Sequence, residues 1–288
     1  MSGVAIVTDS ASDYDPAKAA SLGITIVPLI VNFGKETFSA GVNLSTNDFW
    51  AKMKAPDSPF PTTAACSPGD FQIAYQKAFD AGADGIVSIH VAGTLSGTIK
   101  AAEIGRAMFK DRDIHVVDSM SASMGEGMLA EMGVEMSNAG ASAAEIAETV
   151  TRRRDDLQVY LALETLEYLK RGGRISGAQA AIGSLLSVKP IIEIKDGKVE
   201  TAERVRTRGK AREKLVELLT RRPMDRLSIL HTTDADVEEF AEQLIPRVPG
   251  GIDRSKVSIN LVGPSVGPHL GPGCVGAVAL YTEASRPA

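Results

Sequence analysis

The residues best placed for chemistry are Leu95, Ser96, Gly97 and Thr98, which follow a short apolar run and begin a sequence typical of a helix. The first turn of a helix has unpaired backbone N–H groups and partial positive charge, so it attracts carboxylates and phosphates. The two hydroxyl groups add hydrogen-bond donors, and Gly97 allows a ligand to approach the backbone closely. The pattern predicts an anion-binding loop, with a capped helix that holds no ligand as the alternative.

Sharper signatures do not fit this loop. A phosphate-binding loop of the Walker A type needs a lysine after its last glycine, and Thr98 follows Gly97 here. A nucleophile elbow of the G-x-S-x-G type needs its serine midway between two glycines, but Ser96 stands directly before Gly97. We therefore assign no catalytic residue to the loop.

A second polar loop, residues 60–71, leads into another expected helix. Ser67 is its expected N-cap and Pro68 its first residue. Thr63 lies just before this cap and is placed to reach the same crevice as Ser96. Cys66 has no basic or histidine neighbour in the sequence, so a structural cysteine is favoured over a nucleophile.

The first expected strand ends in the polar residues Thr8, Asp9 and Ser10. Ligands of open α/β sheets bind beyond the carboxyl ends of the strands, so these side chains are candidates for a site. The alternative is that Asp9 or Ser12 caps the helix that begins at Pro16. Both interpretations stay open at this point.

Histidine spacing gives no metal site, because His90, His115, His231 and His269 share no ligand pattern. His269 differs from the others, since it lies in a segment rich in glycine and proline, GPSVGPHLGPGCVG, whose backbone these residues restrict. A rigid loop that displays a single histidine is more typical of a functional site than of packing.

Arginines form two groups. Arg204, Arg206 and Arg208 alternate, so in an extended segment they would project from one face, and Arg171 and Arg174 belong to a glycine-rich loop. A solvated surface is the simplest interpretation, and RNA binding is a second. Aromatic residues make up only 5% of the chain and do not alternate with these arginines, which weakens the RNA hypothesis. A docking face for an acidic or phosphorylated partner fits better.

Two kinds of element must position these residues. Strands are expected at 4–8, 85–90, 114–117 and 159–163, and helices at 68–81, 96–109, 121–138 and 142–154. This alternation predicts an α/β fold with a mainly parallel sheet and helices on both faces. The later chain predicts a hairpin that turns at Asp196 and Gly197, then two strand–helix units and a final apolar run. We expect an N-terminal α/β domain over 1–160 with a small hairpin insertion near 33–44, and a C-terminal α/β domain with a mixed sheet over 161–288.

Composition limits the possible functions. Apolar residues make up 44% of the 288 residues, the net charge is −5, and there are only two cysteines. The negative charge disfavours nucleic acid and anionic membranes, and two cysteines make no disulfide framework. The N-terminus lacks the basic start of a signal peptide, and no run approaches the roughly 20 apolar residues of a membrane span. We expect a cytoplasmic protein without nucleic acid and without stable membrane insertion.

An ordered set of motifs resembles the DegV family of bacterial fatty-acid-binding proteins, which carry acyl chains for a fatty acid kinase. The motifs are VTDSASD, TAACSPGDF, LSGT, VVDSMSASMGEG, LEYLKRGGRIS, VRTRGKA and GPHLGPGCVG, and together they span nearly the whole chain. Each motif is weak alone, whereas their order and spacing are specific. The resemblance implies two α/β domains with the lipid between them, its carboxylate near the interface and its acyl tail in an apolar tunnel.

The resemblance also implies roles for particular residues. The family's carboxylate contacts fall on Thr63 and Ser96, with Gly97 beside them in the LSGT motif. The residues that the family associates with phosphoryl transfer and kinase docking fall on Arg174, Arg206 and His269. The chain departs from the family where Thr63 is followed by A-A-C-S instead of S-Q-P-S, and where Ala92 and Gly93 stand in place of two serines.

The leading hypothesis is a carrier that binds a long-chain fatty acid and presents its carboxylate to a separate kinase, which forms an acyl phosphate. This protein would then need no cofactor and no catalytic residue of its own, and the fatty acid would be its ligand. One alternative is an enzyme acting on a small phosphorylated or carboxylated metabolite, with His269 as acid or base and arginines around the anion. The other is an RNA-binding module that uses Arg204, Arg206 and Arg208.

Overall fold

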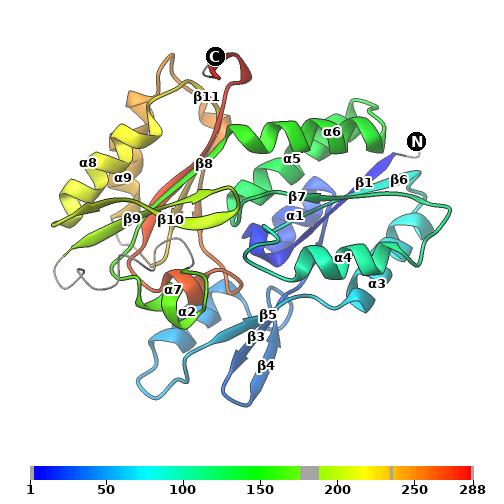
Figure 1. The fold of residues 1–288 in the computed structure, drawn as a ribbon, viewed down its shortest axis with the longest axis horizontal. Helices are drawn as coiled ribbons and strands as arrows, with labels where there is room; N and C mark the ends of the chain where they lie inside the picture. The colour runs from blue at the N-terminus through cyan, green and yellow to red at the C-terminus, as the bar shows by residue number, and fades with distance from the viewer. Residues whose placement is uncertain (1–2, 176–187, 234–235, 287–288) are drawn as a thin grey trace. The chain divides into compact units, whose positions relative to one another are not determined.

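The computed structural model describes residues 3–175, 188–233 and 236–286, which form two compact units (Figure 1). Unit 1 contains the chain up to Asp155 together with Gly263–Ser265, and unit 2 contains Asp156–Val262 and the chain from Val266 onward. Unit 1 holds a parallel sheet and unit 2 a mixed sheet, which confirms the predicted α/β class. The predicted domain ranges, 1–160 and 161–288, stay predictions.

The main sheet of unit 1 has four strands in the order β2-β1-β6-β7, all parallel. They are β1 (Val4–Asp9), β2 (Ile24–Val27), β6 (Gly85–His90) and β7 (Asp113–Asp118). Every residue of β6 is buried, as expected for a strand inside a sheet that helices cover on both faces. Because the strands are parallel, Asp9, His90 and Asp118 end three neighbouring strands at the same edge of the sheet.

Helices cover this sheet in two pairs. In Figure 1, α5 and α6 pack together on one face, and α3 and α4 pack together on the other. The pairs are α3 (Pro68–Asp80) with α4 (Thr98–Arg106), and α5 (Met124–Asn138) with α6 (Ala143–Arg153). Ser67 and Asp70 form a capping box at the start of α3, which confirms Ser67 as an N-cap. The short helix α1 (Pro16–Leu22) lies beside β2.

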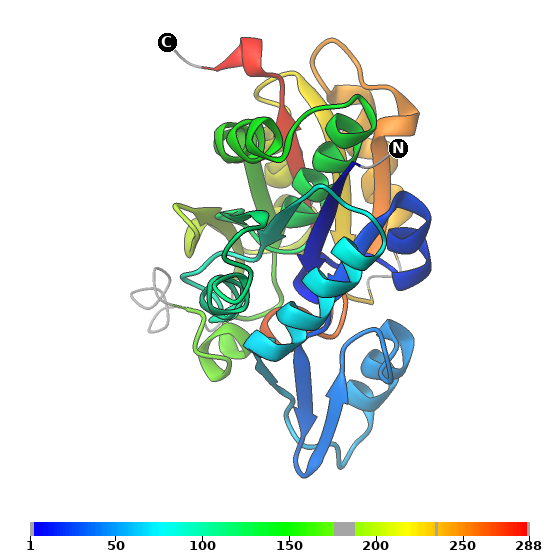
Figure 2. The same cartoon turned by 90° about the vertical axis from the view of Figure 1, so that its right-hand side faces the viewer.

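A small antiparallel sheet positions Thr63. Its order is β4-β3-β5, with β3 (Ile30–Phe33), β4 (Glu36–Ser39) and β5 (Thr62–Ala64), and helix α2 (Thr46–Lys54) follows β4 in the chain. Val31 of β3 pairs with both Phe38 and Thr63, so β3 is the central strand. Figure 2 shows the hairpin of β3 and β4 projecting away from β1 of the same unit.

Unit 2 is built on a six-stranded mixed sheet in the order β10-β9-β8-β13-β11-β12. Its strands are β8 (Leu157–Ala162), β9 (Lys189–Lys195), β10 (Lys198–Val205), β11 (Met224–His231), β12 (Val257–Leu261) and β13 (Val275–Tyr281). The hairpin of β9 and β10 turns at Asp196 and Gly197 as predicted, and both residues have positive φ, 50° and 72°. Two successive positive φ values are typical of the turn that matches strand twist, which explains the Asp-Gly sequence.

Helices of unit 2 bury apolar side chains against this sheet. The longer ones are α8 (Arg208–Leu219) and α9 (Val237–Leu244), and the shorter ones are α7 (Glu167–Arg171) and α10 (Gly267–Leu270). Leu215, Leu219, Phe240 and Leu244 of α8 and α9 are fully buried in one core with residues of β11 and β13. None of the described helices is long and apolar enough to cross a bilayer.

Candidate functional site

The loop Ala92–Gly97, called the Ser96 loop below, connects β6 to α4. Helix α4 begins at Thr98, two residues later than the sequence indicated. Its N-cap residue is Gly97, which has no side chain to bond the N–H groups of the first turn. The hydroxyls of Ser96 and Thr98 lie 2.8 Å apart, and Ser96 Oγ accepts a hydrogen bond of 3.3 Å from the Thr98 N–H. Ser96 is half-buried and Gly97 is exposed, whereas Thr98 is fully buried. Thr98 therefore supports Ser96 and does not itself face a ligand.

A tight turn sets the position of Ser96. The carbonyl oxygen of Ala92 accepts hydrogen bonds from the N–H groups of both Leu95 and Ser96, at 2.9 and 3.1 Å. The backbone N–H of Ser96 is thus occupied inside the loop. Its side-chain hydroxyl can donate to a ligand when Thr98 Oγ1 is the donor of the 2.8 Å bond between the two hydroxyls.

The structure brings the segment that follows Thr63 next to this loop. Thr63 is half-buried in β5, and Ala65 comes two residues later. A methyl group added at Gly97 would lie 3.7 Å from the Cβ of Ala65, which is ordinary van der Waals contact. The two predicted carboxylate contacts, Thr63 and Ser96, therefore belong to segments that pack against each other.

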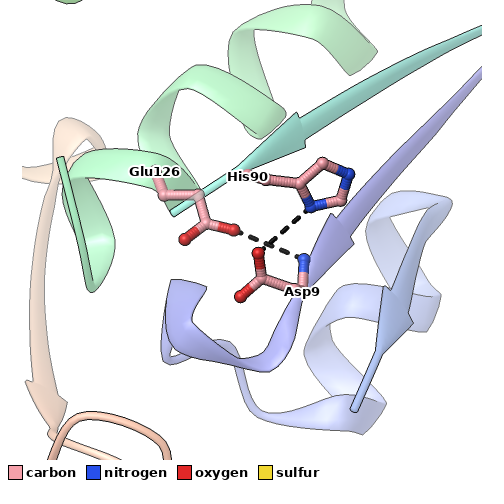
Figure 3. A group of neighbouring side chains, drawn as sticks. All are labelled: Asp9, His90 and Glu126. Carbon is pink, nitrogen blue, oxygen red and sulfur yellow. Dashed lines mark hydrogen bonds and ion pairs between the residues drawn. The ribbon is translucent and has the colours of Figure 1, made fainter. Parts of the chain in front are cut away.

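Asp9, His90 and Glu126 form a buried polar cluster (Figure 3), which is linked to the residue before the loop because Val91 donates its N–H to Asp9. His90 Nδ1 and Asp9 Oδ2 are 3.1 Å apart, and Glu126 Oε1 accepts the N–H of Asp9 at 3.3 Å and the hydroxyl of Thr8 at 2.7 Å. Burial, followed by the charge of Asp9, raises the pKa of Glu126 well above its ordinary value. The cluster therefore favours a protonated Glu126 beside an Asp9 that is held by hydrogen bonds.

The same three side chains have ligand atoms within 4.8 Å of one another, which is compatible with a metal ion. Protein groups already bond to most of these atoms, whereas Glu126 Oε2 is buried without a hydrogen-bond partner among the described residues. The two oxygens of Asp9 accept N–H groups of Ala11 and Val91, and the two ring nitrogens of His90 are bonded to Asp9 and to Ser88. The hydrogen-bond network accounts for this geometry without an ion, and the absence of a metal stays a prediction.

The sequence indicated Asp9 as a candidate for a site but not the cluster with His90 and Glu126. The alternative that Asp9 or Ser12 caps the helix at Pro16 is wrong. Helix α1 is capped by Asp15, which accepts the N–H groups of Ala17 and Lys18. Asp9 caps only the short 3-10 helix Ser10–Ser12. The polar ends of two expected strands were a signal for Asp9 and His90, but Glu126 comes from α5 and gave none.

Cys66 is buried and its Sγ contacts the carbonyl oxygen of Val27 at 3.5 Å. Burial raises the pKa of its thiol above the ordinary value, so the reactive thiolate is disfavoured. The structure thus supports the structural role expected for this residue.

Unit 2 brings together two of the three predicted partner-facing residues, Arg174 and His269. Burial, and secondarily the positive charge of Arg174, lowers the pKa of His269 from 6.5 to about 4. His269 is therefore neutral at physiological pH. Arg174 donates from Nη1 to the carbonyl oxygen of Gly172 at 2.6 Å, which fixes the guanidinium to the loop after α7.

Glycines allow the two loops around His269 to interlock. A methyl group at Gly172 would overlap Nδ1 of His269, and one at Gly271 would overlap the ring of Tyr168. Gly271 also has a φ of +71°, which favours glycine. On the other side of the loop, the buried hydroxyl of Thr232 donates to the Gly271 carbonyl oxygen at 2.6 Å and accepts the Cys274 N–H at 2.8 Å.

Arg206 occupies a different position. It lies in the exposed bend between β10 and α8, and among the described residues no hydrogen bond or ion pair joins it to Arg174 or His269. The single extended face predicted for three arginines is wrong, because β10 ends at Val205 and α8 begins at Arg208. Only Arg204 lies in the strand.

Comparison with known proteins gives the family. The family model named DegV, described as a family of uncharacterised proteins, matches residues 3–282. This chain belongs to the DegV family. A DegV domain-containing protein of Streptomyces coelicolor is 37% identical over 96% of this chain and 97% of its own length.

Two solved DegV structures share the fold over nearly their full length. A DegV family protein from Thermus thermophilus, described as binding fatty acid, has 34% identity and a TM-score of 0.89, covering 97% of this chain and 100% of its own. DegV of Bacillus subtilis, described as a fatty acid binding protein, has 28% identity and a TM-score of 0.86, covering 98% of this chain and 100% of its own.

Proposed function

We propose that this DegV protein is a cytoplasmic carrier that binds a long-chain fatty acid and presents its carboxylate to a separate kinase for acyl phosphate formation. The observation that carries the proposal is the half-buried hydroxyl of Ser96, which lies at the N-terminus of α4 and accepts the Thr98 N–H. The description of two close structural relatives as fatty acid binding proteins supports the choice of ligand.

The carboxylate is proposed to bind at Thr63, Ser96 and Gly97. A hydroxyl, an exposed glycine backbone and the positive end of α4 are groups that favour a carboxylate over a neutral head group. The acyl chain would supply most of the affinity, since burying each CH₂ group is worth about 0.8 kcal/mol. The head-group contacts would then chiefly fix the orientation of the ligand.

Arg174, Arg206 and His269 are proposed to serve phosphoryl transfer and kinase docking. At neutral pH a histidine with a pKa of about 4 is a neutral imidazole, which lacks the imidazolium proton that a general acid gives up but can still accept a proton as a base. A neutral imidazole can still donate and accept hydrogen bonds, and arginines are suited to phosphate groups. This disfavours the alternative of an independent enzyme with His269 as its acid, and no catalytic residue is proposed for this chain alone.

The Ser96→Ala variant tests the head-group assignment. Loss of a hydrogen bond to a charged group should weaken binding of a long-chain fatty acid by about tenfold. Binding of the alcohol of equal chain length should change little, because the acyl contacts stay. Isothermal titration with both ligands measures the two affinities.

Matched controls are available in the same unit. Ser21→Ala removes an exposed hydroxyl in α1, and Thr37→Val removes one in β4 of the sheet that holds Thr63. Both should bind acid and alcohol like the unaltered protein, while Thr63→Val should resemble Ser96→Ala. Equal binding of the acid by Ser96→Ala, Thr63→Val and the controls would refute the proposed head-group site.

A further inference from the structure

Three successive backbone N–H groups at the entrance of the Ser96 loop have three different acceptors. Val91 donates to Asp9 Oδ2 at 3.2 Å, Ala92 to the carbonyl oxygen of Ser121 at 2.8 Å, and Gly93 to Asp118 Oδ2 at 3.1 Å. Asp9 and Asp118 end β1 and β7, the two strands that flank β6. The loop is thus held from both neighbouring strands by carboxylates.

Each carboxylate is itself fixed by a second backbone group. Asp9 Oδ1 accepts the N–H of Ala11 at 2.8 Å, and Asp118 Oδ1 accepts the N–H of Met120 at 2.8 Å. Met120 has a φ of +51°, an uncommon conformation that the bond to Asp118 helps to hold. A side chain that uses both oxygens on backbone N–H groups cannot turn without breaking one of these bonds.

Ala92 connects these hydrogen bonds to Ser96. Ala92 lies between the two anchored N–H groups, and its carbonyl oxygen receives the N–H groups of Leu95 and Ser96. A shift of Val91 or Gly93 therefore moves the turn that orients the Ser96 hydroxyl. The space at Gly93 is also tight, since a methyl group there would lie 3.0 Å from Asp118 Oδ2.

We infer that Asp9 and Asp118 are positioning residues for the Ser96 loop, and that they set its affinity for a carboxylate without touching the ligand. This inference rests on the proposed function. Two carboxylates near the site would by themselves weaken the binding of an anionic ligand through charge repulsion. Their positioning effect on Ser96 must exceed this repulsion.

The Asp118→Asn variant shows whether positioning of Ser96 or repulsion of the ligand dominates, because the two effects change the affinity for a fatty acid in opposite directions. Asparagine has the same shape but one acceptor oxygen, so either the Gly93 or the Met120 N–H would face an NH₂ group. If the carboxylate positions the loop, the variant should bind a long-chain fatty acid at least about tenfold more weakly, as for a lost hydrogen bond to a charged group. If its charge only repels the ligand, the variant should bind more tightly.

The alcohol of the same chain length separates positioning from damage to the fold. Asp118→Asn and Asp9→Asn should leave the affinity for the alcohol nearly unchanged, whereas a general loss of structure would weaken both ligands. Asp15→Asn is the control for loss of a carboxylate charge, since Asp15 caps α1 and accepts two backbone N–H groups through Oδ1 alone, at 3.0 and 3.1 Å, which asparagine can also accept. This control should bind both ligands normally.

A double variant tests whether Asp118 acts through Ser96. In the Ser96→Ala background, adding Asp118→Asn should change the affinity for the acid by less than about twofold, because the group that it positions is gone. Additive losses in the double variant would overturn the inference, as would tighter acid binding by Asp118→Asn or acid binding equal to that of Asp15→Asn. Any of these contradicting outcomes would leave the proposed function unaffected. The proposed function fails only if the unaltered protein binds no fatty acid or binds it independently of Ser96 and Thr63.

Discussion

The Gly172→Ala variant is expected to lose about 99% of kinase-dependent acyl phosphate formation, since a displacement of about 1 Å can cost a hundredfold in rate. A methyl group at Gly172 would overlap Nδ1 of His269 and would lie 3.2 Å from the carbonyl oxygen of Tyr168. The imidazole ring must move, because the backbone at the end of α7 has little room to do so. Fatty acid binding should stay normal, since the proposed carboxylate contacts belong to unit 1.

A second readout needs no kinase. Burial lowers the pKa of His269 to about 4, so a ring that is pushed out of its site should titrate closer to the ordinary value of 6.5. NMR titration of the imidazole in the unaltered protein and in Gly172→Ala measures this rise. The control is Gly173→Ala, where a methyl group has nothing within 4 Å and the positive φ of 70° adds only local strain.

The two glycine variants should differ in both the His269 titration and the kinase-dependent rate. Gly173→Ala should keep the low pKa of His269 and most of the kinase-dependent rate. An unaltered rate together with an unaltered His269 titration in Gly172→Ala would contradict the interlocked geometry of the two loops.

The largest expected effect on stability belongs to Gly276→Ala in unit 2. Gly276 pairs with Leu161 in the middle of the sheet, where β13 lies between β8 and β11. A methyl group there would overlap the carbonyl oxygen of Tyr160 and would lie 2.8 Å from the Cα of Leu161. These are backbone atoms of a buried strand, so they cannot move aside without breaking the ladder.

We expect Gly276→Ala to lower the free energy of unfolding by at least about 3 kcal/mol, as for severe overpacking in a core. Chemical denaturation followed by circular dichroism measures the loss. Gly209→Ala is the matched control, because Gly209 lies in the first turn of α8 with open space around it, so the variant should change the free energy of unfolding by less than about 1 kcal/mol. Equal stability of Gly276→Ala and the unaltered protein would show that the two strands are less closely paired than described.

Much of the fold was predictable because local chemistry and tertiary structure agree. The apolar run that ends at His90 is fully buried in β6, and Asp196 and Gly197 turn the hairpin that their sequence favours. Errors occurred at the element ends, where neighbours compete. Asp15 stands directly before Pro16 and caps α1, which leaves Asp9 for the interior.

The site was predictable only in part. The Ser96 loop follows from hydroxyls and glycine at a helix start, and the family resemblance implies Thr63 as the second carboxylate contact that we propose. The groups that hold the loop did not follow, because Asp9, Asp118 and Val91 come together only when three strands align in register. The contact between His269 and Gly172 could not be predicted either, since nothing in the residue type of Gly172 indicates that an imidazole packs on its backbone.

The central claim is tested most directly by the ligand that the protein carries from the cell. Protein purified under native conditions should release an acyl chain in stoichiometric amount on organic extraction, and mass spectrometry identifies its length and unsaturation. Added fatty acid should also raise the melting temperature of delipidated protein, as binding to the folded state requires. The account is contradicted if extraction yields no acyl chain and no added fatty acid stabilises the protein.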